Sequence, residues 1–325
     1  MKKILIITTG GTIAMGQDER QIVQMMGENV LLSGKSLLDP YAETTFYEFA
    51  NLPSVHLTVG DYLKLRELIL KKCGDYDGFV ITHGTDILEE TAYFLDLTLH
   101  IPQPVVITGA MRSSNELASD GLLNLQQSVQ TAVSEESRDK GVLVVLNGEI
   151  HGARFVQKMH TSHVETFQSP QLGSFGVVDK AGVRYFVRQC KRDYYSIQPD
   201  QLTARVAMVK AGFAVDDSFL QFALDSGAKG IVIEAMGLGH VPPAMIPGIE
   251  RAVAASVPVL VCSRSPRGSV APVYGFVGGG RDLYERGVIF APDLPAHKAR
   301  IKLMVVLAAA AGRETVEEVR KAFGM

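Results

Sequence analysis

ILIITTGGT, at residues 4–12, is the stretch that decides the fold: a short apolar, β-branched run ends in two adjacent glycines and a hydroxyl. Similar runs recur along the chain, and the segments between them carry apolar residues at spacings of three and four, as helices packed on a sheet do. This alternation is the α/β pattern and predicts a mostly parallel sheet flanked by helices. The expected strands are 4–8, 78–82, 105–108 and 142–146, and the expected helices are 61–72, 87–99 and 118–133.

A second, smaller α/β domain is expected in the C-terminal part of the chain. Glycines and prolines break residues 148–186 into short extended pieces, which indicates hairpins that close the first domain. The polar stretch that follows is typical of a linker. We therefore expect an N-terminal domain at 1–188, a linker at 189–204 and a C-terminal domain at 205–325. In the last part, strands are expected at 206–209, 230–234 and 257–261, and helices at 217–224, 247–255, 295–310 and 314–323.

Length and composition restrict the function. A chain of 325 residues exceeds the usual span of one hydrophobic core, which agrees with two domains. Hydrophobic residues make up 46% and charged residues 21%, close to the average of globular proteins. The formal net charge of -3 lacks the basic excess with which proteins neutralise phosphates, so we expect a small-molecule substrate and no nucleic-acid partner.

The cysteines and the apolar runs favour a cytoplasmic protein. Cys73, Cys190 and Cys262 are far apart and form no CxxC pair, which is typical of free thiols in a reducing compartment. The start of the chain enters a strand without the apolar core and cleavage site of a signal peptide. The longest apolar run near the end, 303–311, is shorter than the roughly 18 residues that span a bilayer, so no membrane segment is expected.

The first candidate for chemistry is Thr12, which follows the first expected strand. Ligands bind at the carboxyl ends of the strands in a parallel sheet. Gly10 and Gly11 let the backbone turn sharply and expose N–H groups beside the Thr12 hydroxyl, so one turn offers a nucleophile and an oxyanion donor. A tight strand-to-helix connection and a weak phosphate loop are the alternatives, although no GxGxxG or GxxxxGKS/T motif is present here.

A second candidate turn, His83-Gly84-Thr85-Asp86, follows the strand at 78–82. Asp86 could hold an ammonium group while Thr85 supplies another hydroxyl. Alternatively, either side chain could cap the helix that begins near Ile87. Elsewhere, His151, His160 and His163 could suggest a metal cluster, but no HExxH or Cys/His spacing accompanies them, so no metal is expected.

Taken together, the two turns resemble the two signature segments of the bacterial-type L-asparaginase family. These segments are Thr-Gly-Gly-Thr-Ile-Ala at 9–14 and Gly-Phe-Val-Ile-Thr-His-Gly-Thr-Asp at 78–86. Further similarity occurs at 108–112, at 119–121 with Asn124, at 152–154 with Lys158, and at 294–300, so the resemblance covers almost the whole chain. It implies hydrolysis of the side-chain amide of L-asparagine to aspartate and ammonia without a cofactor. It also implies homodimers or homotetramers with active sites at a subunit interface.

The resemblance also assigns residues to the reaction. Thr12 is the implied nucleophile, and Thr85, Asp86 and Lys158 complete the implied catalytic cluster. The N–H groups of Gly11 and Thr85 would stabilise the oxyanion, and water would cleave the resulting acyl-enzyme ester. The implied substrate contacts are Gly11, Ser54, Val55, Gly84, Thr85, Asp86 and Ala110. Without the resemblance, Ser54 is typical of an ordinary turn serine and Lys158 of a surface lysine.

Two features depart from the family pattern. Ile87 stands where members usually have a third hydroxyl, and the loop at 16–34 contains no tyrosine, although members commonly place one there to assist the attacking threonine. A threonine hydroxyl needs a neighbouring group to take or relay its proton. We hypothesise that Tyr274 of a neighbouring subunit is the helper, with Tyr284 a weaker candidate and lysine-assisted attack through Lys158 as the alternative. A tyrosine packed in the C-terminal core is the simpler interpretation of Tyr274.

Two other functions remain open at this point. One is an amidase subunit that acts on glutaminyl groups attached to tRNA, although such relatives carry an added N-terminal domain and this chain is acidic. The other is a nucleotide-binding module that uses Gly10-Gly11 and the triplet 278–280 as phosphate loops, without catalysis.

Overall fold

The computed structural model describes residues 1–25, 31, 34–188, 192–310 and 315–324. The chain divides into two compact units, Met1–Tyr194 and Tyr195–Met325. Each unit is an α/β structure with its own sheet, so the expected fold class is confirmed. Residues 189–191 lie outside the described part of the chain. They include Cys190 and the start of the expected linker.

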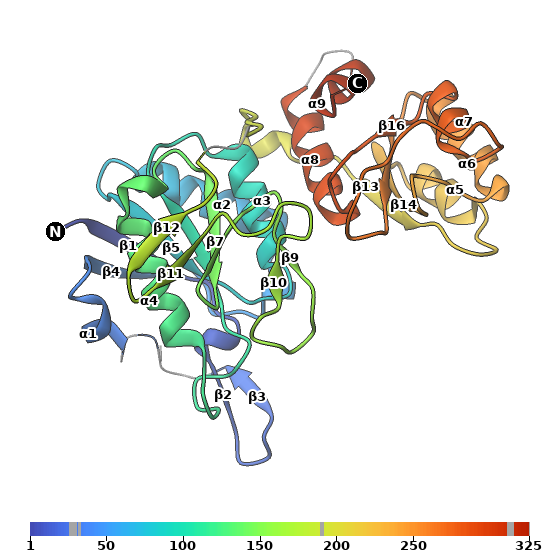
Figure 1. The fold of residues 1–325 in the computed structure, drawn as a ribbon. Helices are drawn as coiled ribbons and strands as arrows, with labels where there is room; N and C mark the ends of the chain where they lie inside the picture. Colours follow the sequence, from blue (N-terminus) through green and yellow to red (C-terminus); the bar gives the residue numbers. More distant parts are fainter. Residues whose placement is uncertain (26–30, 32–33, 189–191, 311–314, 325) are drawn as a thin grey trace. The chain divides into compact units, whose positions relative to one another are not determined.

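The larger unit is built on an eight-stranded sheet (Figure 1). Its order is β12-β11-β8-β7-β6-β5-β1-β4, in which β4, β1, β5, β6 and β7 are parallel and the other neighbours are antiparallel. The parallel strands are β1 (Lys3–Thr8), β4 (Glu43–Glu48), β5 (Gly78–Thr82), β6 (Val105–Thr108) and β7 (Val142–Leu146). The antiparallel strands are β8 (Glu149–Gly152), β11 (Gly176–Asp179) and β12 (Gly182–Tyr185). The three antiparallel strands form the hairpins that were expected to close the domain.

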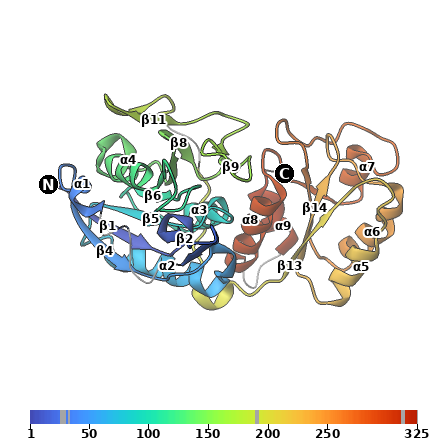
Figure 2. The same ribbon diagram turned by 90° about the horizontal axis from the view of Figure 1, so that it is seen from below.

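Helices cover both faces of this sheet, and Figure 2 shows α4 and α2 on opposite sides of it. Successive side chains of a strand point to opposite faces, so Ile4 and Ile6 of β1 join a core with Leu125 and Val129 of α4. The helices are α1 (Lys35–Leu38), α2 (Val59–Lys72), α3 (Leu88–Thr98) and α4 (Gly121–Val133). Two short pairs of strands lie outside the sheet: β2 (Met15–Gln17) with β3 (Val23–Met25), and β9 (Gln157–Lys158) with β10 (Phe167–Gln168).

The strand order positions the site. β1 lies between β4 and β5, so the connections that leave β1 and β5 go to opposite sides of the sheet. Such a reversal leaves a crevice at the carboxyl ends of the strands, where ligands bind in sheets of this kind. Thr12 and the turn 83–86 follow these two strands directly.

The smaller unit has a parallel four-stranded sheet in the order β13-β14-β15-β16. Its strands are β13 (Val206–Lys210), β14 (Gly230–Ala235), β15 (Val259–Ser263) and β16 (Ile289–Phe290). Its helices are α5 (Ser218–Asp225), α6 (Ile246–Ala254), α7 (Gly280–Glu285), α8 (Ala296–Ala309) and α9 (Thr315–Ala322). Neither α7 nor β16 was expected. Glu314, the expected first-turn carboxylate of the last helix, lies outside the described residues.

None of the helices in the described ranges is long and apolar enough to cross a bilayer.

Candidate active site

Three loops meet at the carboxyl edge of the large sheet. Backbone hydrogen bonds join the turn after β1 to the loop after β4: Gly11 N donates to Leu52 O at 3.1 Å, and Leu52 N donates to Thr9 O at 3.1 Å. The turn after β5 packs against the same place, because a Cβ atom on Gly11 would lie only 2.3 Å from the Gly84 Cα. Gly11 also has a φ of +81°, in the region that favours glycine. Backbone therefore touches backbone, which brings Thr12 beside the turn that carries Thr85.

Lys158 connects the second turn to β9. Its Nζ donates to Thr85 Oγ1 at 2.9 Å and to Asp86 Oδ1 at 2.8 Å. The Lys158 side chain is only 16% exposed, whereas that of Asp86 is 64% exposed. The structure thus brings together three of the four expected catalytic residues through direct contacts, and the interpretation of Lys158 as an ordinary surface lysine is wrong.

Glu89 supports this cluster and was missed from the sequence. It lies in the first turn of α3, is 7% exposed, and accepts a hydrogen bond from the Lys158 backbone N–H at 3.1 Å. A buried carboxylate normally has such a partner, because an unpaired charge is expensive to remove from water. The sequence signal that could have identified Glu89 is its position three residues after Asp86, in the first turn of the helix that follows the signature turn.

Ser54 lies in the loop after β4, against the second turn. The residue is 4% exposed, and its Oγ has no hydrogen-bond partner in the described part of the chain. A Cβ atom on Gly84 would lie 2.8 Å from the Ser54 Oγ, so the hydroxyl and the Gly84 backbone are neighbours. Buried hydroxyls usually have partners, so this unpaired hydroxyl is a candidate for a hydrogen bond to a ligand. The neighbouring Val55 is mostly exposed.

The loop after β6 forms another wall. Ala110 is fully buried, and the start of α4 holds the residues around it. Met111 N and Arg112 N both donate to the Asp120 carboxylate, at 3.0 and 2.9 Å, and Asn124 Nδ2 donates to Gly109 O at 3.0 Å. The motif at 119–124 therefore has a positioning function in this structure.

The expected oxyanion donors need one correction. Gly11 N–H is not free to bind an oxyanion, because it donates to Leu52 O. Within the described residues, the N–H groups of Thr12 and Thr85 make no hydrogen bond. These two N–H groups are therefore open donors at the site.

Where it is described, the segment after the nucleophile is anchored to residues 115 and 116. Gln17 N donates to Asn115 Oδ1 at 2.7 Å, and Asn115 Nδ2 returns a bond to Gln17 O at 2.8 Å. Asp18 accepts bonds from the N–H groups of Arg20 and Ile22. No hydrogen bond joins residues 16–25 to Thr12 in this part of the chain, and residues 26–30 and 32–33 of the same loop lie outside the described residues.

Tyr274 belongs to the smaller unit. The residue is 48% exposed, and its ring packs edge-on against His240 with centroids 5.0 Å apart. The interpretation of Tyr274 as a buried core residue is therefore wrong, whereas its helper function stays a prediction. Tyr284 is also partly exposed and lies under the Arg281 guanidinium.

The glycine triplet 278–280 does not form an open phosphate loop. Gly278 N donates to Asp282 Oδ2 at 2.8 Å, and Gly279 N donates to Phe276 O at 2.7 Å. A phosphate-binding loop needs backbone N–H groups that point at the ligand. These two N–H groups already have partners, which counts against the nucleotide-binding interpretation.

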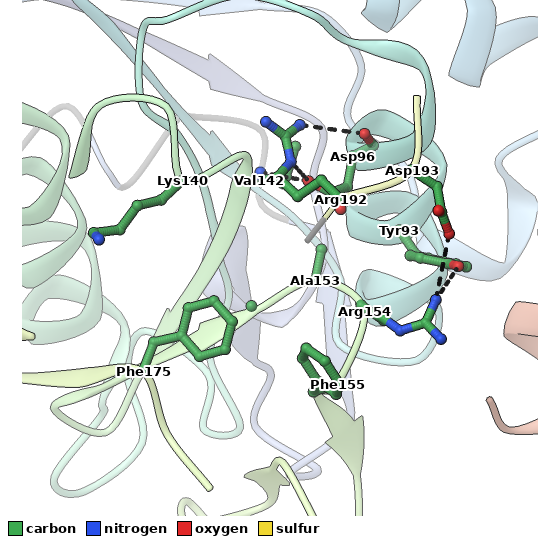
Figure 3. A pocket seen from close by; sticks show the side chains of 11 residues that line it. Tyr93, Asp96, Lys140, Val142, Ala153, Arg154, Phe155, Phe175, Arg192 and Asp193 are labelled. Atoms are coloured by element: carbon green, nitrogen blue, oxygen red, sulfur yellow. Dashed lines mark hydrogen bonds and ion pairs between the residues drawn. The ribbon is translucent and has the colours of Figure 1, made fainter. Parts of the chain in front are cut away.

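A small cavity of the larger unit is lined by other residues, among them Asp96, Val142 and Arg192 (Figure 3). At its wall, Arg192 Nε donates to Asp96 Oδ1 at 3.0 Å, and the same oxygen accepts a bond from Val142 N at 3.0 Å. Burial raises the pKa of Asp96, and the Arg192 charge opposes that rise. Arg192 is thus held to α3, and Asp96 also links α3 to β7, so we assign the cluster a structural function.

Comparison with known proteins identifies the family. The profile of the N-terminal asparaginase domain matches residues 3–191, and that of the glutaminase/asparaginase C-terminal domain matches residues 205–323. The L-asparaginase of Bacillus licheniformis is 37% identical over 310 residues, which cover 94% of this chain and 96% of the relative. A probable L-asparaginase of Deinococcus radiodurans is 38% identical over 325 residues, 98% of this chain and 97% of the relative.

A more distant relative has a different name. A glutamyl-tRNA(Gln) amidotransferase component from Methanosarcina mazei is 31% identical over 321 residues, 94% of this chain and 74% of the relative. Fold and site define a two-domain α/β protein with a threonine, lysine and aspartate cluster at the carboxyl edge of its larger sheet. The chain belongs to the asparaginase family, and the resemblance seen in its motifs is confirmed.

Proposed function

We propose that this protein is an L-asparaginase, which hydrolyses the side-chain amide of L-asparagine to L-aspartate and ammonia. The observation that carries the proposal is the contact of Lys158 Nζ with both Thr85 Oγ1 and Asp86 Oδ1, beside the turn that bears Thr12. Similarity to L-asparaginases over nearly the full chain supports the same conclusion.

In the proposed reaction, the Thr12 hydroxyl oxygen attacks the amide carbon of the substrate. The carbonyl oxygen becomes an oxyanion, and the open N–H groups of Thr12 and Thr85 stabilise it. The carbonyl re-forms as the carbon–nitrogen bond breaks, and the departing NH₂ group takes up the proton that the Thr12 hydroxyl gave up during attack and leaves as ammonia. Water cleaves the ester that remains on Thr12, which releases aspartate and restores the hydroxyl.

Lys158 sets the direction of the Thr85 hydroxyl. Thr85 Oγ1 accepts a hydrogen bond from Nζ, so its own hydrogen points elsewhere and is available for the substrate, the nucleophile or water. Asp86 accepts a bond from the same ammonium group, which holds the carboxylate next to the hydroxyl. These three side chains would therefore act as one hydrogen-bonded unit that moves or holds a proton near Thr12.

The remaining site residues would bind the ends of the substrate. Asp86 has an exposed carboxylate that suits the α-ammonium group of asparagine, and the unpaired Ser54 hydroxyl suits its α-carboxylate. Gly11, Val55, Gly84 and Ala110 would form the walls, the two glycines because only a hydrogen fits at their positions.

We also propose the organisation of the chain and its assembly. The domain boundaries are 1–188, 189–204 and 205–325, supported by the two compact units and the two family matches. The assembly is a homodimer or homotetramer, as the family resemblance implies. A cytoplasmic location is supported by Cys73 and Cys262, which are both free thiols, and burial raises the pKa of Cys262 further above its usual range.

The test is ammonia release from L-asparagine, L-glutamine and D-asparagine by the purified protein. We expect release from L-asparagine, and slower release from L-glutamine, because one extra methylene in a pocket changes rates by about 10- to 200-fold. A protein that releases no ammonia from L-asparagine above a heat-inactivated control would overturn the proposal. Thermal stabilisation by a nucleotide without amide hydrolysis would instead support the binding module.

A further inference from the structure

His83 is the first residue of the second turn, and the proposed reaction does not use its side chain. The residue directly follows β5, and its side chain is completely buried. Its Nδ1 lies 2.7 Å from Gly84 O, and its Nε2 lies 3.0 Å from Thr91 Oγ1 in α3. Its own backbone N–H donates to Thr108 O at 2.8 Å, so both backbone and ring are fixed.

These partners determine the tautomer of the ring. A carbonyl oxygen can only accept a hydrogen bond, so Nδ1 must carry the hydrogen that reaches Gly84 O. Nε2 is then the acceptor, and the Thr91 hydroxyl donates to it. Burial lowers the pKa of His83 to about 4, which keeps the ring neutral at pH 7.

The carbonyl that His83 holds belongs to the same peptide unit as the Thr85 N–H. A trans peptide is planar, so its C=O and N–H point in opposite directions. Gly84 has no side chain to restrict rotation of this peptide, so its orientation depends on external contacts. The bond from His83 anchors the carbonyl toward the buried ring and directs the Thr85 N–H to the opposite side, where no acceptor meets it among the described residues.

We propose that His83 is a positioning residue for oxyanion stabilisation: its Nδ1–H holds the Gly84 carbonyl so that the Thr85 N–H faces the oxyanion formed by attack of Thr12. The bond also polarises the peptide, because linked hydrogen bonds strengthen one another. This inference rests on the proposed amide hydrolysis and assigns a function to a buried ring outside the reacting groups.

Three variants test the proposal. His83→Leu fills the space without a donor, His83→Asn places an amide N–H near the position of Nδ1, and Thr91→Val removes the bond that fixes the tautomer. Loss of an oxyanion donor lowers kcat by roughly 100- to 1,000-fold, so misorientation of one in His83→Leu should lower kcat by about 10- to 100-fold. KM should stay within about threefold, since the donor acts mainly in the transition state. His83→Asn should recover most of the lost kcat, and Thr91→Val should fall between the two.

L-aspartate binding by calorimetry serves as the control for folding, and each variant should bind the product as the wild type does. A wild-type kcat in His83→Leu, or equal losses in His83→Leu and His83→Asn with intact aspartate binding, would overturn the positioning function. A wild-type protein without ammonia release would overturn the proposed function instead.

The ring itself provides a readout that does not depend on activity. In ¹⁵N-histidine-labelled wild-type protein, the ring signals of His83 are those that disappear in His83→Asn. We expect their nitrogen shifts to show a neutral ring with its hydrogen on Nδ1. A hydrogen on Nε2 would contradict the proposal, because the ring could then not donate to Gly84 O.

Discussion

Thr12 gains its chemical position from the residues on both sides of it. Gly10 and Gly11, with φ values of +98° and +81°, turn the chain sharply after β1, and Thr12 begins a short 3₁₀ turn with its N–H unpaired among the described residues. A hydroxyl and an open N–H on one residue supply a nucleophile and one oxyanion donor for attack on an amide carbonyl.

Replacement of Thr12 tests this residue directly. Thr12→Ala should lower the rate of asparagine hydrolysis by at least about 1,000-fold, because covalent chemistry without its nucleophile loses several orders of magnitude. The fold and the affinity for L-aspartate should remain, because the hydroxyl has no structural bond in the described part of the chain. Thr12→Ser is the matched control and should keep measurable activity. A Thr12→Ala protein with more than about a tenth of the wild-type rate would rule out the nucleophile.

The contact of Lys158 with Thr85 and Asp86 predicts non-additive effects. Thr85→Val and Lys158→Met should each lower kcat severely, and the double variant should be little worse than either, because residues that act as a unit lose their function together. Lys180→Met, at an exposed lysine, should match the wild type. Initial rates of ammonia release from the wild type, the two single variants and the double variant form the double-mutant cycle. Fully multiplicative losses would show that Thr85 and Lys158 act independently.

At the scale of elements, the site depends on loops that touch through their backbones. Gly11 meets Gly84 so closely that a methyl group cannot be inserted between them, whereas a Cβ on Gly173 would meet nothing within 4 Å. Gly11 and Gly173 have nearly the same φ, +81° and +82°. The pair therefore separates the effect of backbone conformation from that of close approach.

Gly11→Ala and Gly173→Ala should consequently differ in stability. Each should lose about 1 kcal/mol through the unfavourable φ. Gly11→Ala should lose roughly a further 1 to 3 kcal/mol through overpacking. It should also lose most of its activity, because the turns of β1 and β5 must separate. Urea unfolding and ammonia release measure the two effects. Equal stabilities, or a fully active Gly11→Ala protein, would contradict the close approach of these turns.

For the whole molecule, the buried His83 predicts a dependence of stability on pH. Its pKa of about 4 in the folded protein lies below the ordinary value of 6.5, so the unfolded chain binds the proton first. The contribution of the neutral His83 ring to the free energy of unfolding is fully present above about pH 6.5. It declines as the pH falls toward 4, by about 3 kcal/mol in total. His83→Asn should therefore lose less of its unfolding free energy than the wild type between these pH values, as urea titrations would show. Identical pH profiles for the two proteins would exclude the neutral buried ring.

The assembly can be tested through Tyr274. If a neighbouring subunit supplies this phenol, Tyr274→Phe should lower kcat by about 10- to 100-fold, in the range of a lost acid–base group. Mixing the subunits of Tyr274→Phe with those of inactive Thr12→Ala should then restore activity, because a mixed dimer has one site with both native residues. Val273→Ala, at an exposed neighbour, is the control. A Tyr274→Phe protein that matches the wild type would make assistance through Lys158 the better account.

Several elements could be predicted from the sequence because their signals are local. The strands β6 and β7 have the expected bounds, since a buried parallel strand needs a continuous β-branched, apolar run. Helix ends were less predictable. α2 begins earlier than expected, at Val59, because Thr58 and Asp61 form a capping box, and α4 begins later, at Gly121, because Ala118 has a φ of +54°.

By itself, the sequence determined the α/β class, the family and the two turns that carry Thr12 and Thr85, because glycines and hydroxyls at strand ends are short-range patterns. Only the tertiary structure decided which groups meet across those turns. The contact between Lys158 and Thr85 spans 73 positions, and the anchoring of Lys158 by Glu89 spans 69. The tertiary structure also decided that the Gly11 N–H donates to Leu52 O and is therefore not open to an oxyanion. Such contacts depend on how closely the loops of neighbouring strands approach, and that distance is set by the packing of the whole sheet edge.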